Sequence, residues 1–304
     1  MENNLSDKNE NKNKDRKGRG VSHSKIILMG EHSVVYGYPA IAIPLKNIRM
    51  ECIVERAALP FIHNKKDTLS TAIYTALNYL NRKSENIKYK VISDIPPKRG
   101  MGSSAAVSIA AIRGVLDYFN TEVDNLTLEK LVNEAEIIAH NTPSGLDAKT
   151  CLSDSAIKFI KNKGFKNLEM NLGAYLLIAD TGIHGHTRDA IMNIKNMGDR
   201  ALPMLEKLGK LTEETEKFIE EKDAINIGKN MISAHGELKK LGVSIEKSDI
   251  LVKAAIDEGA YGAKMSGGGL GGCIIALMES REKAEMTGKK LMEKGAVNIW
   301  IEAL

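Results

Sequence analysis

Residues 96–106, with the sequence PPKRGMGSSAA, constrain this chain most, because they place two glycines and two serines where a helix begins. The next residues, 107–115, are mostly small and apolar and predict a buried helix. Backbone N–H groups at a helix start lack intrahelical partners, and the helix dipole adds partial positive charge there. Glycine lets the backbone approach oxygens closely, so this turn suits an anion such as phosphate. Alone, the segment is equally compatible with a capped helix after a Pro-Pro turn.

Length and composition place the chain among ordinary globular proteins. Its 304 residues suggest about two domains. Hydrophobic residues make up 43% and charged residues 27%, which allows a substantial core. The net charge of +4 is too small to indicate a nucleic-acid or membrane surface, so neither partner is expected. An anionic small molecule remains compatible with this charge.

Cysteine usage and the absence of long apolar runs bear on the compartment. Cys52, Cys151 and Cys273 are odd in number, far apart and without zinc spacing, which favours core thiols in a reducing environment. No apolar run approaches the roughly 18 residues of a membrane span, and the polar N-terminus is unlike a secretory signal. A cytoplasmic location is therefore expected.

The order of predicted elements favours an α+β fold with two lobes. Residues 1–20 are almost all polar or charged and predict a disordered tail. Strands are predicted at 26–29, 40–45, 48–54, 87–92, 174–179, 262–266, 273–277 and 297–301. Helices are predicted at 67–80, 103–119, 127–139 (capped at Thr127), 188–197, 201–208, 213–219, 224–241, 248–258 and 282–293. Because strands and helices do not alternate regularly, a doubly wound sheet is excluded.

Two further glycine-bearing segments accompany the Pro-Pro loop. Residues 25–37, KIILMGEHSVVYG, predict a strand that begins at Lys25 and ends in Gly-Glu-His. Residues 264–272, KMSGGGLGG, hold five glycines among six residues, which is best explained by a tight backbone turn near a ligand. An apolar strand pattern follows this turn where a dinucleotide-binding fingerprint needs a helix, so that fingerprint is excluded.

A fourth segment, residues 136–147, carries two carboxylates on either side of a helix break. Glu136 and His140 are four residues apart and share one helix face. Pro143 and Gly145 break the helix, so Asp147 comes from a new turn. One metal ligand and one base would fit this arrangement. A surface glutamate and a capping aspartate are the structural alternative.

Together these four segments resemble the GHMP kinase superfamily and, within it, the mevalonate kinases. They occur in the family order over nearly the whole chain after the tail. Ser22-His23-Ser24 replaces the usual Ala-Pro-Gly before Lys25, and Met101 stands where leucine is common. The resemblance implies the two-lobed GHMP kinase fold. Its N-terminal, ATP-binding lobe (residues 21–157) would resemble ribosomal protein S5 domain 2. Its C-terminal ferredoxin-like lobe (residues 158–304) would close over the substrate.

The resemblance also implies a reaction: Mg²⁺-dependent transfer of the γ-phosphoryl group of ATP to the primary hydroxyl of mevalonate, in isoprenoid precursor biosynthesis. Asp147 would accept the hydroxyl proton, with Lys25 close to it and to the γ-phosphate, and Ser104 and Glu136 would hold Mg²⁺. Backbone amides would cradle the triphosphate at Lys98, Arg99, Gly100, Met101, Gly102, Ser103 and Ser104. Candidate substrate residues are Glu31, His32, Ser144 and Thr187, with Thr181 as a further option.

Two alternatives remain. The chain could be another small-molecule kinase of the superfamily; galactokinases, for example, share Gly-Glu-His but continue with a sugar-binding pair where this chain has Ser33 and Val34. It could also be a catalytically silent regulator that binds a nucleotide or metabolite. The joint presence of Lys25, Glu136 and Asp147 argues against silence. A homodimer is common in the superfamily, although no feature of this sequence requires one.

Overall fold

The computed structural model describes residues 16–140 and 145–304, and the chain divides into two compact units. The first unit comprises the described residues up to Ser24, Ile48–Ile95 and Gly102–Leu152; the second comprises Lys25–Asn47, Pro96–Met101 and Ser153–Leu304. Each unit is thus assembled from separated pieces, rather than from the consecutive stretches 21–157 and 158–304. The physical reason is that strands β1 (Lys17–Met29) and β2 (Pro39–Arg56) each contribute to both units.

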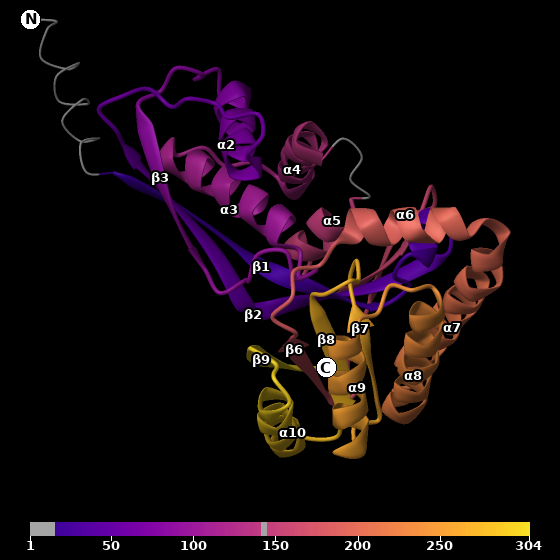
Figure 1. The fold of residues 1–304 in the computed structure, drawn as a ribbon. Helices are drawn as coiled ribbons and strands as arrows, with labels where there is room; N and C mark the ends of the chain where they lie inside the picture. The colour runs from indigo at the N-terminus through magenta and orange to yellow at the C-terminus, as the bar shows by residue number, and fades with distance from the viewer. Residues whose placement is uncertain (1–15, 141–144) are drawn as a thin grey trace, which may run out of the picture. The chain divides into compact units, whose positions relative to one another are not determined.

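The first unit packs helices beside a strand pair. β3 (Ile87–Ser93) runs antiparallel to the second half of β2, with Cys52 opposite Val91. The helices are α2 (Thr68–Tyr79), α3 (Ser103–Tyr118), α4 (Asn125–His140) and α5 (Leu146–Leu152). Helices α2, α3 and α4 pack on one another, and α5 packs on α3 and α4 (Figure 1). Ile109 and Ile112 of α3 are fully buried, as the small apolar run after the serines predicts.

The second unit contains a four-stranded antiparallel sheet in the order β7-β8-β6-β9. Its strands are β6 (Tyr175–Asp180), β7 (Gly262–Ser266), β8 (Cys273–Met278) and β9 (Asn298–Ala303). Helices α9 (Glu246–Asp257) and α10 (Arg281–Glu293) cover one face, where Leu251 and Leu291 meet Leu177 and Ile274 in a buried core.

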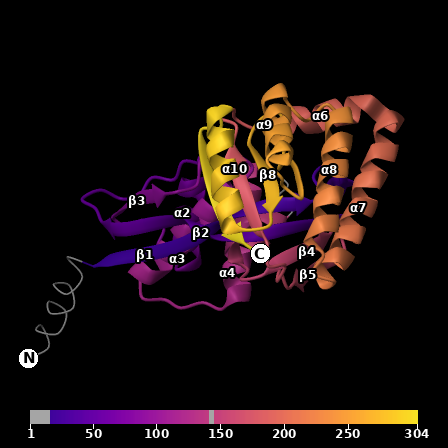
Figure 2. The same cartoon turned by 90° about the horizontal axis from the view of Figure 1, so that it is seen from below.

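The second unit also contains a strand pair beside β2 and several further helical segments. β4 (Ala156–Ile160) runs antiparallel to the first half of β2 and pairs with β5 (Gly164–Leu168). A 3-10 turn, η1 (Ser33–Tyr36), contacts α7 (Leu202–Glu220). The other helical segments are α6 (Thr187–Met197), η2 (Gly198–Ala201), α7 (Leu202–Glu220) and α8 (Ala224–Lys240). Helices α7 and α8 lie side by side in both views (Figures 1 and 2).

Three local expectations in the first half of the chain need correction. Residues 17–20, expected in the tail, belong to β1, while residues 1–15 lie outside the described part of the chain. The expected strands 40–45 and 48–54 are one strand, because the polar residues Lys46 and Asn47 are exposed without interrupting it. Helix α4 begins before Thr127, whose N–H donates to the carboxylate of Asp124 at 2.6 Å, so Asp124 supplies the cap.

Helix α7 is continuous where two helices, 201–208 and 213–219, were expected. Gly209 lies in the middle of it and is a site of close packing rather than a break. A Cβ added at Gly209 would lie 2.3 Å from the ring of Tyr38. The glycine therefore lets the helix backbone approach Tyr38. Apart from these local differences, the predicted α+β class with two units is confirmed.

This packing predicts opposite effects for two helical glycines. Gly209→Ala should lower the free energy of unfolding by about 1–3 kcal/mol, because the added methyl group overlaps the Tyr38 ring. Gly236→Ala in α8 should raise it by about 1 kcal/mol, because nothing lies within 4 Å of its added Cβ. Urea unfolding of both variants measures the difference. Equal stability of the two variants would contradict the close approach at Gly209.

Candidate active site

The loop before α3 has alternating signs of φ along its backbone. Lys98, Gly100 and Gly102 have φ of 58°, 78° and 70°, and the residues between them are not left-handed. Such alternation turns successive N–H groups toward one side and forms a concavity that binds anions. Gly102 is the N-cap of α3 and has no side chain to cap the first turn. The backbone of this loop is therefore suited to phosphate oxygens.

The side chains within this loop differ in their exposure and therefore in whether they can contact a ligand. Met101 is fully buried, so only its backbone can serve a ligand, and its carbonyl accepts a hydrogen bond from the N–H of Lys25 at 3.2 Å. Lys98 is exposed, and Ser103 and Ser104 are half-buried at the first turn of α3. The expectation that backbone amides bind the triphosphate is consistent with these positions and stays a prediction.

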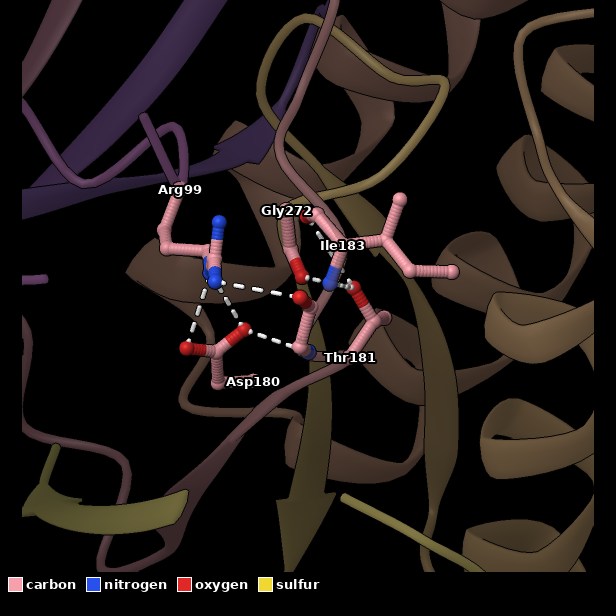
Figure 3. A network of polar contacts seen from close by, with 6 residues as sticks. Arg99, Asp180, Thr181, Ile183 and Gly272 are labelled. Atoms are coloured by element: carbon pink, nitrogen blue, oxygen red, sulfur yellow. Dashed lines mark hydrogen bonds and ion pairs between the residues drawn. The ribbon is translucent and has the colours of Figure 1, made fainter. Parts of the chain in front are cut away.

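The Arg99 side chain contacts the segment at the end of β6, 81 residues further along the chain. Its Nε lies 2.7 Å from one carboxylate oxygen of Asp180 and 2.9 Å from the other, and its Nη2 donates to the carbonyl of Gly182 at 3.2 Å. Nearby, the Thr181 hydroxyl donates to the carbonyl of Gly272 at 2.6 Å (Figure 3). These contacts join the Pro-Pro loop to the segment after β6 and to the glycine-rich turn.

In the first unit, the two predicted metal ligands meet. The hydroxyl of Ser104 donates to the carboxylate of Glu136 at 3.0 Å, and Glu136 is 7% exposed. Ser108, one turn further along α3, donates to the same oxygen at 3.0 Å. Sequence reasoning missed Ser108, although its spacing of four residues from Ser104 places both on one helix face.

Asp147 and Lys25 occupy different units. Asp147 lies in the first turn of α5, after Gly145 with φ of 78°, and is half-buried. This position follows the predicted break, since α5 is a new helix. Lys25 lies on β1 and is 2% exposed. Ser144, a candidate substrate residue, falls outside the described residues.

Glu31 is enclosed rather than open to solvent. It is 1% exposed, and its carboxylate is paired with the ammonium group of the fully buried Lys264. The Lys264 ammonium also donates to the carbonyl of Met265 at 2.8 Å. Burial raises the pKa of Glu31 and lowers the pKa of Lys264, and each charge opposes the effect on the other. Glu31 therefore forms an ion pair within the second unit, and its expected place among the substrate ligands stays a prediction.

His32 is the next residue and is 7% exposed with φ of 61°. Burial lowers the pKa of its imidazole to about 4, and the nearby Lys264 charge acts in the same direction. The side chain is therefore neutral at pH 7. A neutral imidazole can both donate and accept a hydrogen bond, which suits a hydroxyl-bearing ligand.

The lowered pKa of His32 predicts a pH dependence of stability. The folded pKa of about 4 lies below the ordinary 6.5, so the unfolded chain binds the proton first as the pH falls. The free energy of unfolding should therefore decrease by about 2–3 kcal/mol between pH 7 and 4.5 through this group. His32→Gln should remove that part of the slope in urea unfolding. His184→Gln, at an exposed site, gives the reference slope, and an unchanged slope in His32→Gln would contradict the assignment.

Two glycines of the turn between β7 and β8 lie too close to neighbouring atoms to accommodate a side chain. A Cβ at Gly268 would lie 1.9 Å from the hydroxyl oxygen of Thr187, so only glycine fits beside the first residue of α6. Gly269 has φ of 78°, and a Cβ there would lie 2.5 Å from the carbonyl of Val243. The exposed Thr187 thus borders the turn, as expected for a residue that contacts substrate or phosphate, and its binding role stays a prediction.

The described part of the chain lacks both a cluster of potential metal ligands and a helix suited to a membrane. Residues 16–140 and 145–304 contain no group of three or more histidine, cysteine, aspartate or glutamate side chains able to hold a metal ion. Over the same residues, none of the helices has the length and apolar character needed to cross a membrane.

Comparison with known families identifies both halves of the chain. Residues 71–154 match the GHMP kinases N terminal domain, and residues 215–295 match the GHMP kinases C terminal domain. A mevalonate kinase of Pyrococcus furiosus is 31% identical, over 88% of this chain and 91% of its own length.

Solved structures agree with these matches. A mevalonate kinase from methicillin-resistant Staphylococcus aureus MRSA252 is 30% identical with a TM-score of 0.75, covering 95% of this chain and 99% of the other. The mevalonate kinase of L. major in complex with R-mevalonate has a TM-score of 0.84 at 23% identity, covers 95% of this chain and 96% of its own, and shows the shared fold. With both family domains matched and relatives aligned over nearly its whole length, the chain belongs to the GHMP kinase family.

Proposed function

We propose that this chain transfers the γ-phosphoryl group of ATP to the primary hydroxyl of mevalonate, giving 5-phosphomevalonate and ADP. The observation that carries the proposal is the 31% identity, over 88% of the chain, to a mevalonate kinase. The loop geometry before α3 and the Ser104–Glu136 pair support the phosphoryl-transfer part. Transfer of this kind depends on positioning and charge neutralisation more than on covalent catalysis.

The nucleotide is held by the start of α3 and the loop before it. Backbone N–H groups of residues 98–104 bind the triphosphate oxygens, aided by the helix dipole. Ser104 and Glu136 fit Mg²⁺, because their oxygens lie 3.0 Å apart and Mg²⁺ prefers one or two protein oxygens beside phosphates and water. Bound Mg²⁺ would offset phosphate charge during the transfer.

The remaining candidate residues bind and deprotonate the acceptor hydroxyl of the substrate. Asp147 accepts its proton as the new bond to the γ-phosphorus forms and the bond to the β-phosphate oxygen breaks. The ammonium of Lys25 offsets negative charge on the transferred group. The substrate is oriented by Glu31, His32, Ser144 and Thr187, and the pair with Lys264 holds the Glu31 carboxylate in place.

Glu136→Gln tests the metal assignment. The amide retains shape but lacks the charge that binds Mg²⁺, so the Mg²⁺ concentration for half-maximal activity should rise about tenfold. Glu134→Gln, at an exposed position on the same helix, should leave the Mg²⁺ titration unchanged. A Glu136→Gln titration that overlays the wild type would remove Glu136 from the metal site.

The substrate is tested by ADP release with Mg-ATP and a panel of mevalonate, galactose, homoserine and phosphomevalonate. Turnover with mevalonate alone supports the proposal. Turnover with another panel member overturns the substrate and leaves a different GHMP small-molecule kinase. Nucleotide binding without turnover on any member favours the regulatory alternative. A homodimer and a cytoplasmic location remain predictions, to be measured by light scattering and by fractionation.

A further inference from the structure

The segment Pro96–Met101 belongs to the second unit and makes several contacts there that have no part in the proposed phosphoryl transfer. Its side-chain anchor is Arg99, whose side chain is 11% exposed and pairs with the Asp180 side chain, which is 4% exposed. The two residues are 81 positions apart in sequence. An arginine–carboxylate pair this deeply buried fixes geometry strongly, because either charge left alone is poorly solvated.

The carboxylate of Asp180 is itself fixed by the turn that follows β6. It accepts a hydrogen bond from the N–H of Gly182 at 2.8 Å, while the carbonyl of Gly182 accepts one from Arg99. Aspartate and arginine therefore close a ring of polar contacts around this turn, as Figure 3 shows for the side chains. The guanidinium cannot reorient without breaking contacts to both residues.

Backbone contacts extend the attachment along the loop. The carbonyl of Lys98 accepts a hydrogen bond from the N–H of Gly185 at 2.9 Å. A Cβ at Gly100 would lie 3.3 Å from the Cα of Gly267, so the loop and the glycine-rich turn are in close contact. Lys98 has φ of 58°, an unfavourable conformation for a residue with a side chain, which persists only where the surroundings enforce it.

We propose that Arg99 is a positioning residue: through Asp180 its side chain holds the phosphate-binding backbone of residues 98–101 in its anion-binding conformation. This inference rests on the proposed function, in which that backbone binds the triphosphate. It assigns Asp180 a role as well, through its contacts with the Arg99 guanidinium group. The alternative is that the Arg99 guanidinium itself binds a phosphate.

The two roles differ in the expected effect of Asp180→Asn on Mg-ADP affinity. If Arg99 acts through Asp180, then Arg99→Met, Asp180→Asn and the double variant should each weaken Mg-ADP binding about tenfold, without additivity. If Arg99 binds phosphate directly, Arg99→Met alone should weaken binding, and Asp180→Asn should preserve or strengthen it by freeing the guanidinium. Isothermal titration calorimetry measures the dissociation constants.

Adenosine separates positioning of the phosphate loop from general damage to the fold. It lacks phosphates, so its affinity should be unchanged in all three variants, whereas a merely structural defect would weaken adenosine and Mg-ADP alike. Arg200→Met, at an exposed arginine, should bind both ligands as the wild type does. Equal loss of adenosine and Mg-ADP affinity would overturn the proposal.

Arg99→Lys keeps the test decisive where the other variants fold poorly. It preserves the charge opposite Asp180 but loses the fork that also reaches Gly182, so Mg-ADP affinity should lie between those of wild type and Arg99→Met. Amide hydrogen exchange in residues 98–101 should rise in Arg99→Lys, and wild-type exchange there would overturn the proposal. Wild-type protein that binds Mg-ADP but does not phosphorylate mevalonate would overturn only the proposed substrate. Failure of wild type to bind Mg-ADP would overturn both.

Discussion

Asp147→Asn is expected to lower kcat by about a thousandfold, within the range attributed to a general base. Asparagine has nearly the same shape as aspartate but cannot accept the hydroxyl proton as the carboxylate does. The KM for ATP should change little, because the phosphate-binding backbone and the Ser104–Glu136 pair are untouched. Steady-state ADP release at saturating ATP and mevalonate measures kcat, and thermal unfolding checks that the variant remains folded.

A matched control lies just beyond the same short helix. Asp154 follows α5 by two residues, and its exposed carboxylate lies 3.9 Å from the ammonium group of Lys46. Asp154→Asn should retain wild-type kcat. Near-normal turnover of Asp147→Asn would exclude Asp147 as the base, whereas equal losses in both variants would indicate a change in the surrounding segment rather than lost proton transfer.

The sequence predicts the local parts of this site because their signals are local. Helix α3 begins at Ser103, where the glycines and serines indicate a start. Pro143 and Gly145 predict a break before Asp147, and the structure places Asp147 on α5, a separate helix from α4. Turn chemistry and helix caps act over a few residues, so a single sequence reveals them.

The long-range pairs could not be predicted in the same way. Glu31 and Lys264 are separated by 233 residues, and nothing near either one indicates that they meet. Lys264 was visible only as the residue that opens the glycine-rich segment. Its complete burial depends on tertiary packing, which overrides the usual exposure of lysine.

Gly209 shows a similar limit within one helix. A glycine within a helical pattern predicts a break in the helix, because glycine has a low intrinsic helix propensity. In the folded chain, however, Gly209 leaves room for the ring of Tyr38 to pack against the helix. A single sequence does not indicate this contact. The predicted end of a helix near Gly209 was therefore wrong, because a contact with a residue distant in sequence explains the glycine.

Lys264→Met should lower the free energy of unfolding by about 3–5 kcal/mol, because it leaves the carboxylate of Glu31 buried without its partner. Adding Glu31→Gln should restore part of this loss, because the double variant has no unpaired buried charge. The pair Lys253–Asp257 is the control, since its side chains are 75% and 57% exposed. Lys253→Met should cost less than about 1 kcal/mol.

The deficit in Lys264→Met should also depend on pH with a defined sign. Burial already raises the pKa of Glu31, and removing the ammonium raises it further. The variant can then bind a proton on Glu31 in the folded state more readily than in the unfolded state. Its stability relative to wild type should therefore improve as the pH falls from neutral through the raised pKa of Glu31. Urea unfolding across that range measures it. A deficit independent of pH would show that lost packing of the lysine side chain, rather than the unpaired carboxylate, causes the instability.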